Sequence, residues 1–261
     1  SGASKRPGLN AAQRMRRRAS AALADSGLVE VLSYPFISNT HDRQLIPESD
    51  GRRQTLRLAN PLADDAAGLR TRILDSLLET AERNAARGVT PLALYESGQV
   101  AVTGIEPAEI IGTDRRPSDE ELETLLAGVP DQPWRIAGVM GGAFAPKSGA
   151  QLEASDKGLG NWDWSDAIQA ARLVGEVNGI TIEASRTWKP EPDGKRYGPP
   201  MPPLVKEPGE TAPWHPSRCA TLFVRRGKGY VIVGYAGELH PKVVENFGLP
   251  ARSVAFELDL S

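Results

Sequence analysis

One periodic stretch, residues 60–98, constrains the fold of this chain more than any other part of the sequence. Between Arg70 and Gly88 the apolar residues recur at steps of three and four, which places one apolar stripe along a helix. Gly88 suits the end of that helix, because glycine adopts left-handed backbone angles without a Cβ clash. Residues 94–98 then predict a strand, so the stretch predicts a strand end, a turn, a long helix, a loop and a strand. The stripe consists of Ile73, Leu74, Leu77, Leu78, Ala81 and Ala85.

Length and composition place the chain among ordinary globular domains. Its 261 residues can bury a large core in one domain or in two small ones. Hydrophobic residues make up 40% and charged residues 25%, which is average for globular chains. The formal net charge of −2 gives no bulk attraction to nucleic acid, so any contact with RNA requires a local basic patch.

Three further features indicate where the chain works. The single cysteine, Cys219, cannot form an internal disulfide and favours a reducing compartment. No apolar run reaches the length of a membrane span, and no secretory signal opens the chain. The sequence starts Ser-Gly-Ala-Ser without an initiator methionine. We therefore expect a piece of a longer, cytoplasmic protein that has no membrane partner.

The N-terminal part predicts a capped helix followed by short strands. Asn10 and Gln13 fit a capping box, and the helix that they open ends at Gly27. Residues 29–37 are rich in β-branched and aromatic side chains and predict a strand interrupted by a proline. Residues 55–58 predict a further short strand that leads into the periodic stretch.

The middle of the chain contains a proline-rich segment between two predicted strands. Residues 100–102 continue the strand that precedes them, and residues 135–140 predict an apolar strand. Between these strands, residues 105–133 hold several prolines around a short acidic helix at 119–126. We interpret this segment as an insertion.

A pair of acidic residues further along allows two interpretations. Residues 161–179 predict a helix with Asp163 and Asp166 near its start, followed by a strand over 181–185. Two carboxylates at this spacing could serve catalysis or hold a metal ion. We favour capping, because anions are stabilised at helix N-termini.

Proline density divides the C-terminal part into a loop and a regular unit. Residues 188–214 hold too many prolines for a core element, so we expect a surface insertion, with docking of a proline-recognising partner as the alternative. Residues 219–226 and 229–236 alternate around a glycine turn and predict a hairpin. A helix over 241–248 and a strand over 254–260 complete the chain.

Arginine is clustered on two predicted helices. Such clusters are solvated faces in many proteins, but guanidinium groups also contact RNA phosphates or a partner subunit, and both interpretations stay open. The first helix carries Arg14, Arg16, Arg17 and Arg18, and the second carries Arg70, Arg72, Arg83 and Arg87 off its apolar stripe. The candidates for RNA or subunit contacts are Arg14, Arg16, Arg17, Arg18, Arg83 and Arg87.

No residue pattern in the chain predicts a catalytic, cofactor or metal site. His215 and His240 each precede a proline, where an imidazole commonly satisfies a backbone group, and no serine or cysteine motif pairs with either. The third histidine, His41, has no metal-ligand spacing with them, and Cys219 alone cannot form a thiolate site. We expect structural histidines and a core cysteine.

Two sets of short motifs resemble a known family. Asn-Pro-Leu at 60–62, Leu-Arg-Thr at 69–71 and Leu-Tyr-Glu-Ser-Gly at 94–98 resemble the core of the bacterial-type phenylalanyl-tRNA synthetase β subunit. His-Pro at 215–216 and Gly-Glu-Leu-His-Pro at 237–241 follow in the order that this family has. The resemblance implies structural roles for Asn60, Pro61, Leu69, Arg70, Thr71, Asn84, Glu96, Gly98, His215, Pro216, Arg218, Gly237, Glu238, His240 and Pro241.

The resemblance also implies a fold and a place in a larger enzyme. The fold would be α+β, a class II synthetase-like and mainly antiparallel sheet flanked by helices. It would cover residues 1–261, the B6–B7-type region of the β subunit, with insertions near 105–133 and 188–214. The whole enzyme would be an α2β2 assembly that uses ATP and Mg to join phenylalanine to tRNA(Phe). This segment would bind no cofactor itself and would pack against the catalytic α subunit, in an assembly that holds a second β chain.

Comparison with the catalytic subunit of that family implies that this segment is inactive. That subunit has an arginine for ATP on one strand and another that closes a glycine-rich strand and helix, where residues 94–98 and 254–260 of this chain have none. Glu257 and Asp259 stand there instead and would repel ATP. Two alternatives stay open. An RNA-binding accessory module acting through the arginine-rich helices would bind with steep salt dependence, and a self-sufficient adenylate-forming enzyme would catalyse ATP–pyrophosphate exchange.

Overall fold

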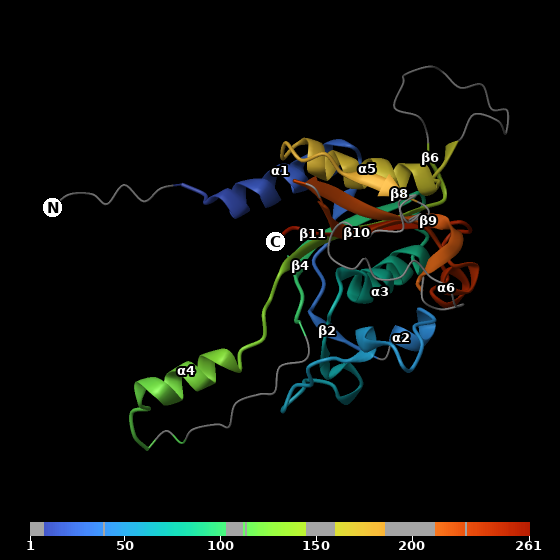
Figure 1. The fold of residues 1–261 in the computed structure, drawn as a ribbon. Helices are drawn as coiled ribbons and strands as arrows, with labels where there is room; N and C mark the ends of the chain where they lie inside the picture. Colours follow the sequence, from blue (N-terminus) through green and yellow to red (C-terminus); the bar gives the residue numbers. More distant parts are fainter. Residues whose placement is uncertain are drawn as a thin grey trace, which may run out of the picture.

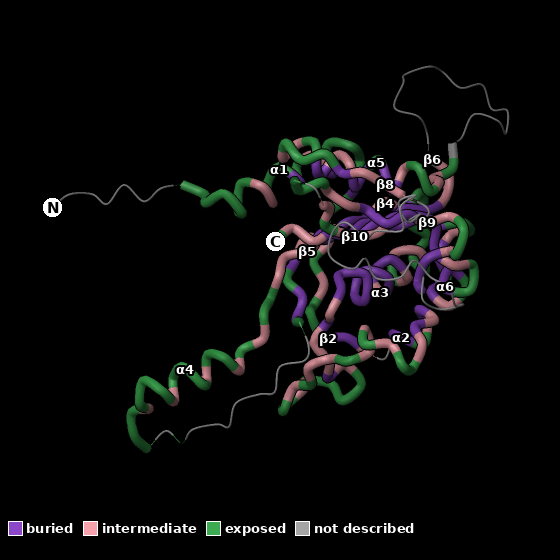
Figure 2. Tube along the Cα trace, viewed as in Figure 1, coloured by how far each residue is buried: buried purple, intermediate pink, exposed green. Residues whose placement is uncertain are grey.

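A seven-stranded sheet, covered by helices on both faces, organises the chain. The structure is a computed structural model that describes residues 8–38, 40–102, 112, 114–144, 160–185, 212–227 and 229–261. Helices α1 and α5 cover one face of the sheet, and α3 and α6 cover the other (Figure 1). The buried residues lie along the central strands and the helix surfaces that face them (Figure 2).

The strand order in this sheet is β1-β4-β5-β11-β10-β9-β8. Every neighbouring pair is antiparallel except β1 and β4, which confirms the predicted mainly antiparallel sheet flanked by helices. Two small sheets pair β2 with β3 and β6 with β7. The strands are β1 Val29–Glu30, β2 Phe36–Ile37, β3 Gly68–Leu69, β4 Leu92–Gln99, β5 Trp134–Gly141, β6 Ala143–Phe144, β7 Gly160–Asn161, β8 Glu183–Ser185, β9 Trp214–Arg226, β10 Gly229–Leu239 and β11 Val254–Asp259.

Side-chain caps begin the longer helices. The Asn10 side chain accepts from the Gln13 amide at 2.8 Å, which confirms the predicted capping box of α1. The Asp163 carboxylate accepts from the Ser165 amide at 2.7 Å, and Asp166 accepts from the Asp163 amide, so these acids cap α5 as we expected. The helices are α1 Ala11–Asp25, α2 Thr40–Arg43, α3 Ile73–Ala86, α4 Asp119–Ala127, α5 Trp164–Glu176 and α6 Pro241–Asn246, with 3-10 turns η1 Gly51–Arg53 and η2 Asp64–Ala66.

The two faces of the sheet hold separate hydrophobic cores. Alternation along β4 turns Leu94 toward α3 and Tyr95 toward α1, because successive side chains of a strand point to opposite faces. The Tyr95 hydroxyl donates to the Ser20 carbonyl at 2.9 Å and ties α1 to the sheet. Leu77 and Leu78 of α3 are fully buried in the other core, as the predicted apolar stripe requires.

Two predicted strand segments are wrong. Residues 55–58 form no named strand and contribute an isolated bridge between Arg57 and Gly68. Strand β4 ends at Gln99 instead of continuing to residue 102. It ends there because the next amides donate to carbonyls outside the strands of the sheet. The Val100 amide donates to the Pro133 carbonyl, and the Ala101 amide donates to the Arg70 carbonyl.

The predicted strand over 29–37 is divided between two sheets. Its first two residues pair with β4, and its last two pair with β3. Pro35 lies between the two pieces and has no N–H to donate to a ladder, while its carbonyl accepts from the Arg70 amide at 2.8 Å. The proline therefore marks the point where the chain leaves the large sheet.

The structure describes the helix of the first predicted insertion and little of the second. The acidic helix of the first is confirmed as α4, which stands away from the body of the molecule (Figure 1). Of the second, residues 188–211 lie outside the described residues. The hairpin that follows begins at Trp214, earlier than predicted, and its two strands are the longest in the chain segments described.

We expect Leu78→Ala to lower the free energy of unfolding by about 2–5 kcal/mol, because it leaves a cavity between α3 and the sheet. Leu126→Ala is the matched control. Leu126 lies on α4 and is 70% exposed, so we expect a change of about 0.5 kcal/mol or less. Urea unfolding followed by circular dichroism measures both. Equal effects of the two substitutions would contradict this packing.

Candidate functional site

A buried ion pair fixes the segment that leads into α3. Nη1 of Arg70 lies 2.6 Å from Oε1 of Glu96 and also donates to the Ser76 hydroxyl at 2.8 Å. The side chains of Arg70 and Glu96 are 5% and 0% exposed. The prediction that the Arg70 side chain is solvated or contacts RNA is therefore wrong. Gly98 makes this position available, because a Cβ there would collide with the Arg70 guanidinium.

A second buried pair caps the helix itself. Nη2 of Arg72 donates to Oδ1 of Asp75 at 2.6 Å and to the side-chain oxygen of Gln44 at 2.8 Å. Asp75 also accepts from the Arg72 amide at 3.1 Å. The solvated interpretation is thus wrong for Arg72 as well. It fits Arg83 and Arg87 at the other end of α3, which are both exposed.

The carboxylate of Glu257 on β11 completes this arrangement. Its two oxygens accept from the amides of Ile73 and Leu74 at 3.0 and 3.2 Å. Burial raises the pKa of Glu257, and the nearby Arg135 and Arg72 charges act against that rise. The amides at the start of α3, where an external anion would bind, are therefore occupied by an acid of the chain itself. We call Arg70, Arg72, Asp75, Glu96 and Glu257 the α3 polar cluster.

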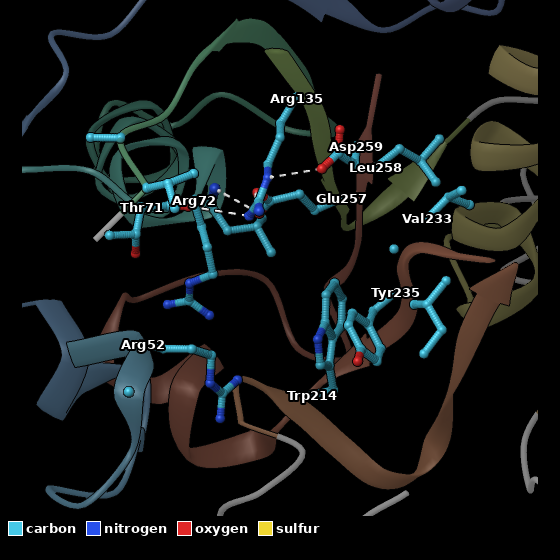
Figure 3. A pocket seen from close by; sticks show the side chains of 16 residues that line it. Arg52, Thr71, Arg72, Arg135, Trp214, Val233, Tyr235, Glu257, Leu258 and Asp259 are labelled. Carbon is cyan, nitrogen blue, oxygen red and sulfur yellow. Dashed lines mark hydrogen bonds and ion pairs between the residues drawn. The ribbon is translucent and has the colours of Figure 1, made fainter. Parts of the chain in front are cut away.

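A cavity of about 430 Å³ lies beside the α3 polar cluster (Figure 3). Residues of the segment before α3, of η1 and of strands β5, β9, β10 and β11 line it. The polar and aromatic lining residues are Arg52, Thr71, Arg72, Arg135, Trp214, Tyr235, Glu257 and Asp259.

Three arginines, Arg52, Arg72 and Arg135, reach this cavity from separate parts of the chain. Arg52 is paired with Asp50 at 2.6 Å, and Arg135 lies 3.6 Å from Glu257 and 4.0 Å from Asp259. The search of the sequence for phosphate-binding arginines covered the segments that form β4 and β11, and neither strand carries one. The cavity arginines lie on other elements, so that search did not find them. Each guanidinium has a carboxylate beside it, which leaves little net positive charge for a polyphosphate.

The two motif histidines and their neighbours hold the chain around the hairpin. Nδ1 of His240 accepts from the Lys242 amide at 3.1 Å and caps α6, which begins with Pro241. Nδ1 of His215 accepts from the Ser217 amide at 3.1 Å. Both imidazoles are thus engaged in local backbone contacts. Nearby, Arg218 and the buried Glu238 form a pair with a nitrogen–oxygen distance of 2.6 Å.

The remaining motif residues lie apart from the cavity or contribute local contacts. The Asn84 side chain donates to the Thr80 carbonyl at 2.8 Å within α3. Asn60 and Pro61 lie in an exposed loop before η2. Gly237 has a φ of +155°, and a Cβ there would meet the backbone of the neighbouring strand β9. Cys219 is half-buried and packs against the α3 core.

The arginines of α1 are partly used within the molecule. The Arg16 guanidinium lies 4.0 Å from the centroid of the Trp134 ring, and Arg18 donates to the Asn178 side chain at 3.0 Å. Arg14 donates to the Leu9 carbonyl. Arg17 is exposed and has no such contact among the described residues. The four arginines therefore do not form one free basic patch.

Apolar side chains are exposed along the edge of the sheet beside α1. Val29, Leu32 and Tyr34 are 60%, 91% and 82% exposed, and the Tyr34 ring stacks on Phe36 with centroids 6.4 Å apart. Strand β1 is the edge strand here. We call Val29, Leu32 and Tyr34 the β1 apolar strip.

Neither metal ligation nor membrane crossing is indicated in the described part of the chain. No group of three or more His, Cys, Asp or Glu side chains there is placed to hold a metal ion. No helix there has the length and apolar character that a membrane span requires.

The fold and these contacts define a mixed α/β domain whose motif side chains position a helix and a hairpin instead of converging on a reactive group. Its family follows from comparison with known proteins. The chain belongs to the phenylalanyl-tRNA synthetase β chain family, because the family model for the CLM domain of that chain matches residues 1–260.

Curated relatives agree with this family. The chain is 39% identical over 257 residues to the phenylalanine–tRNA ligase β subunit of Thermobifida fusca and 38% identical to that of Streptomyces avermitilis. It is 39% identical over 260 residues to the β subunit of Nocardia farcinica. In each comparison the match covers 97% of this chain and 27% of the relative, so the chain spans about a quarter of the relatives' length.

We expect Glu96→Gln to lower the free energy of unfolding by about 3–5 kcal/mol, because it leaves the Arg70 charge buried without its partner. Glu82→Gln is the matched control on α3, since Glu82 pairs with Arg43 at the same 2.6 Å but is 38% exposed. Its effect should be much smaller. Urea denaturation compares the two. A Glu96→Gln variant as stable as the control would contradict a buried pair.

Acidification should destabilise the fold through His41. This side chain is 4% exposed, and burial, together with the Arg72 and Arg53 charges, lowers its pKa below the usual 6.5. The unfolded chain therefore binds more protons than the folded chain below pH 6.5, so the free energy of unfolding falls as pH drops. Denaturant unfolding at pH 7.5 and 5.5 should show a smaller fall for His41→Gln than for the parent chain. An equal fall would contradict the assignment.

Proposed function

We propose that this chain is the part of a phenylalanine–tRNA ligase β subunit that packs against the catalytic α subunit and takes no part in the chemistry. The assembly would be α2β2, it would work in the cytoplasm, and it would use ATP and Mg to charge tRNA(Phe) with phenylalanine. The β1 apolar strip is the observation that carries this proposal. The antiparallel sheet with helices on both faces supports a class II synthetase-like fold for the segment.

The β1 apolar strip has the character of a subunit contact. Three large apolar side chains, each at least 60% exposed, lie within six residues at an open sheet edge. Large apolar side chains left exposed near one another in the chain are typical of protein–protein interfaces, and the unpaired edge of β1 offers backbone groups to a partner. Arg17 on the adjacent helix α1 could add a polar contact at the rim of such an interface.

The contacts at the start of α3 support the proposal that this chain does not itself form an adenylate. Glu257 occupies the amides of Ile73 and Leu74, and carboxylates lie beside the three cavity arginines. A triphosphate needs uncompensated donors and cations, because its charge has to be neutralised in the transition state. An RNA-binding role has less support, since Arg16 and Arg18 are engaged within the molecule.

The proposal is tested by light scattering after gel filtration of the complete β polypeptide mixed with its catalytic subunit. We expect a stable complex, and we expect Leu32→Asp to weaken it by at least about tenfold, because a charge would be buried in an apolar contact. Leu62→Asp is the control, since Leu62 is 95% exposed but lies outside the strip. A complex that tolerates Leu32→Asp as well as Leu62→Asp would contradict this interface.

A further inference from the structure

The cavity beside the α3 polar cluster is a feature that a purely structural role leaves unexplained. Its volume of about 430 Å³ falls within the range of small-molecule sites. It combines a charged wall from η1, the segment before α3 and strands β5 and β11 with an aromatic wall from the hairpin strands β9 and β10. Each wall restricts the chemistry of what could bind.

The charged wall offers an unused cationic donor. Arg72 donates through Nη2 to Gln44 and Asp75, while its buried Nε and its Nη1 have no hydrogen-bond partner among the described residues. The residue as a whole is 9% exposed, so its charge lies in a largely desolvated position. Figure 3 shows the Arg72 guanidinium between Arg135 and Arg52, at the side of the cavity. A ligand oxygen there would form a charge-assisted hydrogen bond.

The aromatic wall is formed by two flat rings, each of which carries one polar atom. Trp214 of β9 is 6% exposed, and Tyr235 of β10 lies next to it in the cavity (Figure 3). The Tyr235 hydroxyl has no hydrogen-bond partner in the described part of the chain, and burial raises its pKa above the usual 10. Such a surface suits a planar ring.

The acidic residues limit how much negative charge a ligand can carry. Glu257 and Asp259 line the side of the cavity that holds Arg135, at 3.6 and 4.0 Å from its guanidinium. A ligand with charge along its whole length would approach these carboxylates. One anionic group directed at the unpaired donors of Arg72 avoids them. Arg52 is not such a donor, because its guanidinium is engaged by Asp50 and by the Ala212 carbonyl.

We propose that this cavity binds a small planar organic carboxylate, with its carboxylate directed at Arg72 and its ring against Trp214 and Tyr235. This goes beyond the subunit-contact role and does not depend on it. Binding would link the α3 polar cluster to the hairpin, because the two walls belong to those two units. The ligand would stabilise the folded chain by mass action.

Equilibrium dialysis of radiolabelled indole-3-acetate against the complete polypeptide, without its catalytic subunit, tests the proposal. Indole-3-acetamide is the uncharged match, and acetate is the anion without a ring. We expect saturable binding of indole-3-acetate at one site. The amide should bind at least about tenfold more weakly, because the charge-assisted bond is lost, and acetate should also bind weakly, because it cannot contact the aromatic wall.

Three variants locate the site. Arg72→Gln removes the cation that the carboxylate would contact, and Val102→Trp places a bulky ring in the cavity from a residue that is 39% exposed and leaves the charges intact. We expect each to weaken indole-3-acetate binding by at least about tenfold. Arg87→Gln changes an exposed arginine outside the cavity and should have no effect. Thermal melts of each variant confirm that it is folded.

The contrary outcomes are equally definite. Absence of saturable binding, equal binding of the acetate and acetamide forms of indole, or unchanged binding in folded Val102→Trp protein would each overturn the proposal. None of these outcomes would affect complex formation with the catalytic subunit, so the two proposals fail separately.

Discussion

The contact between the Glu257 carboxylate and the start of α3 determines how that face of the sheet is built. A helix N-terminus carries unpaired amides and the positive end of the helix dipole, so a buried start requires an acceptor. Glu257 provides it to Ile73, a residue 184 positions away in the sequence. The pair of Arg70 and Glu96 adds a second tie, from the segment before the helix to strand β4. The helix is thereby fixed against the central strands β4 and β11, which position the cavity walls.

These buried charges specify position more than they add stability. Replacing a buried ion pair with apolar residues is often neutral, whereas removal of one partner leaves an uncompensated charge. Arg70, Arg72 and their partners therefore make other placements of α3 unfavourable. The same arrangement has a consequence for ligands. The helix amides have an internal acceptor, and the donors that Arg72 leaves unpaired among the described residues, Nε and Nη1, belong to a side chain.

The sequence predicted the local elements well and the buried polar contacts poorly. Apolar periodicity and capping residues depend on near neighbours, so α1, α3 and α5 were predicted with their caps or stripes. Helical periodicity places Arg70 and Arg72 on the helix, but α3 begins at Ile73, so the apolar stripe does not determine whether these two side chains are exposed. The missed signal was Glu96, which shares a strand face with the buried Leu94 and therefore needed a cation. The cavity could not be predicted, because its walls come from segments that only the folded sheet brings together.

Three residues of the motif over 94–98 have an explanation in folding. Leu94 fills the α3 core, Glu96 supplies the charge that holds Arg70, and Gly98 supplies the space that the guanidinium occupies. A side chain at position 98 would displace Arg70 and leave Glu96 buried without its cation. The three residues thus act as one unit with the segment before α3. A motif of this kind needs no reaction to account for it, and what partners can recognise is then the surface that the unit holds in place: the exposed edge of the sheet and the cavity beside α3.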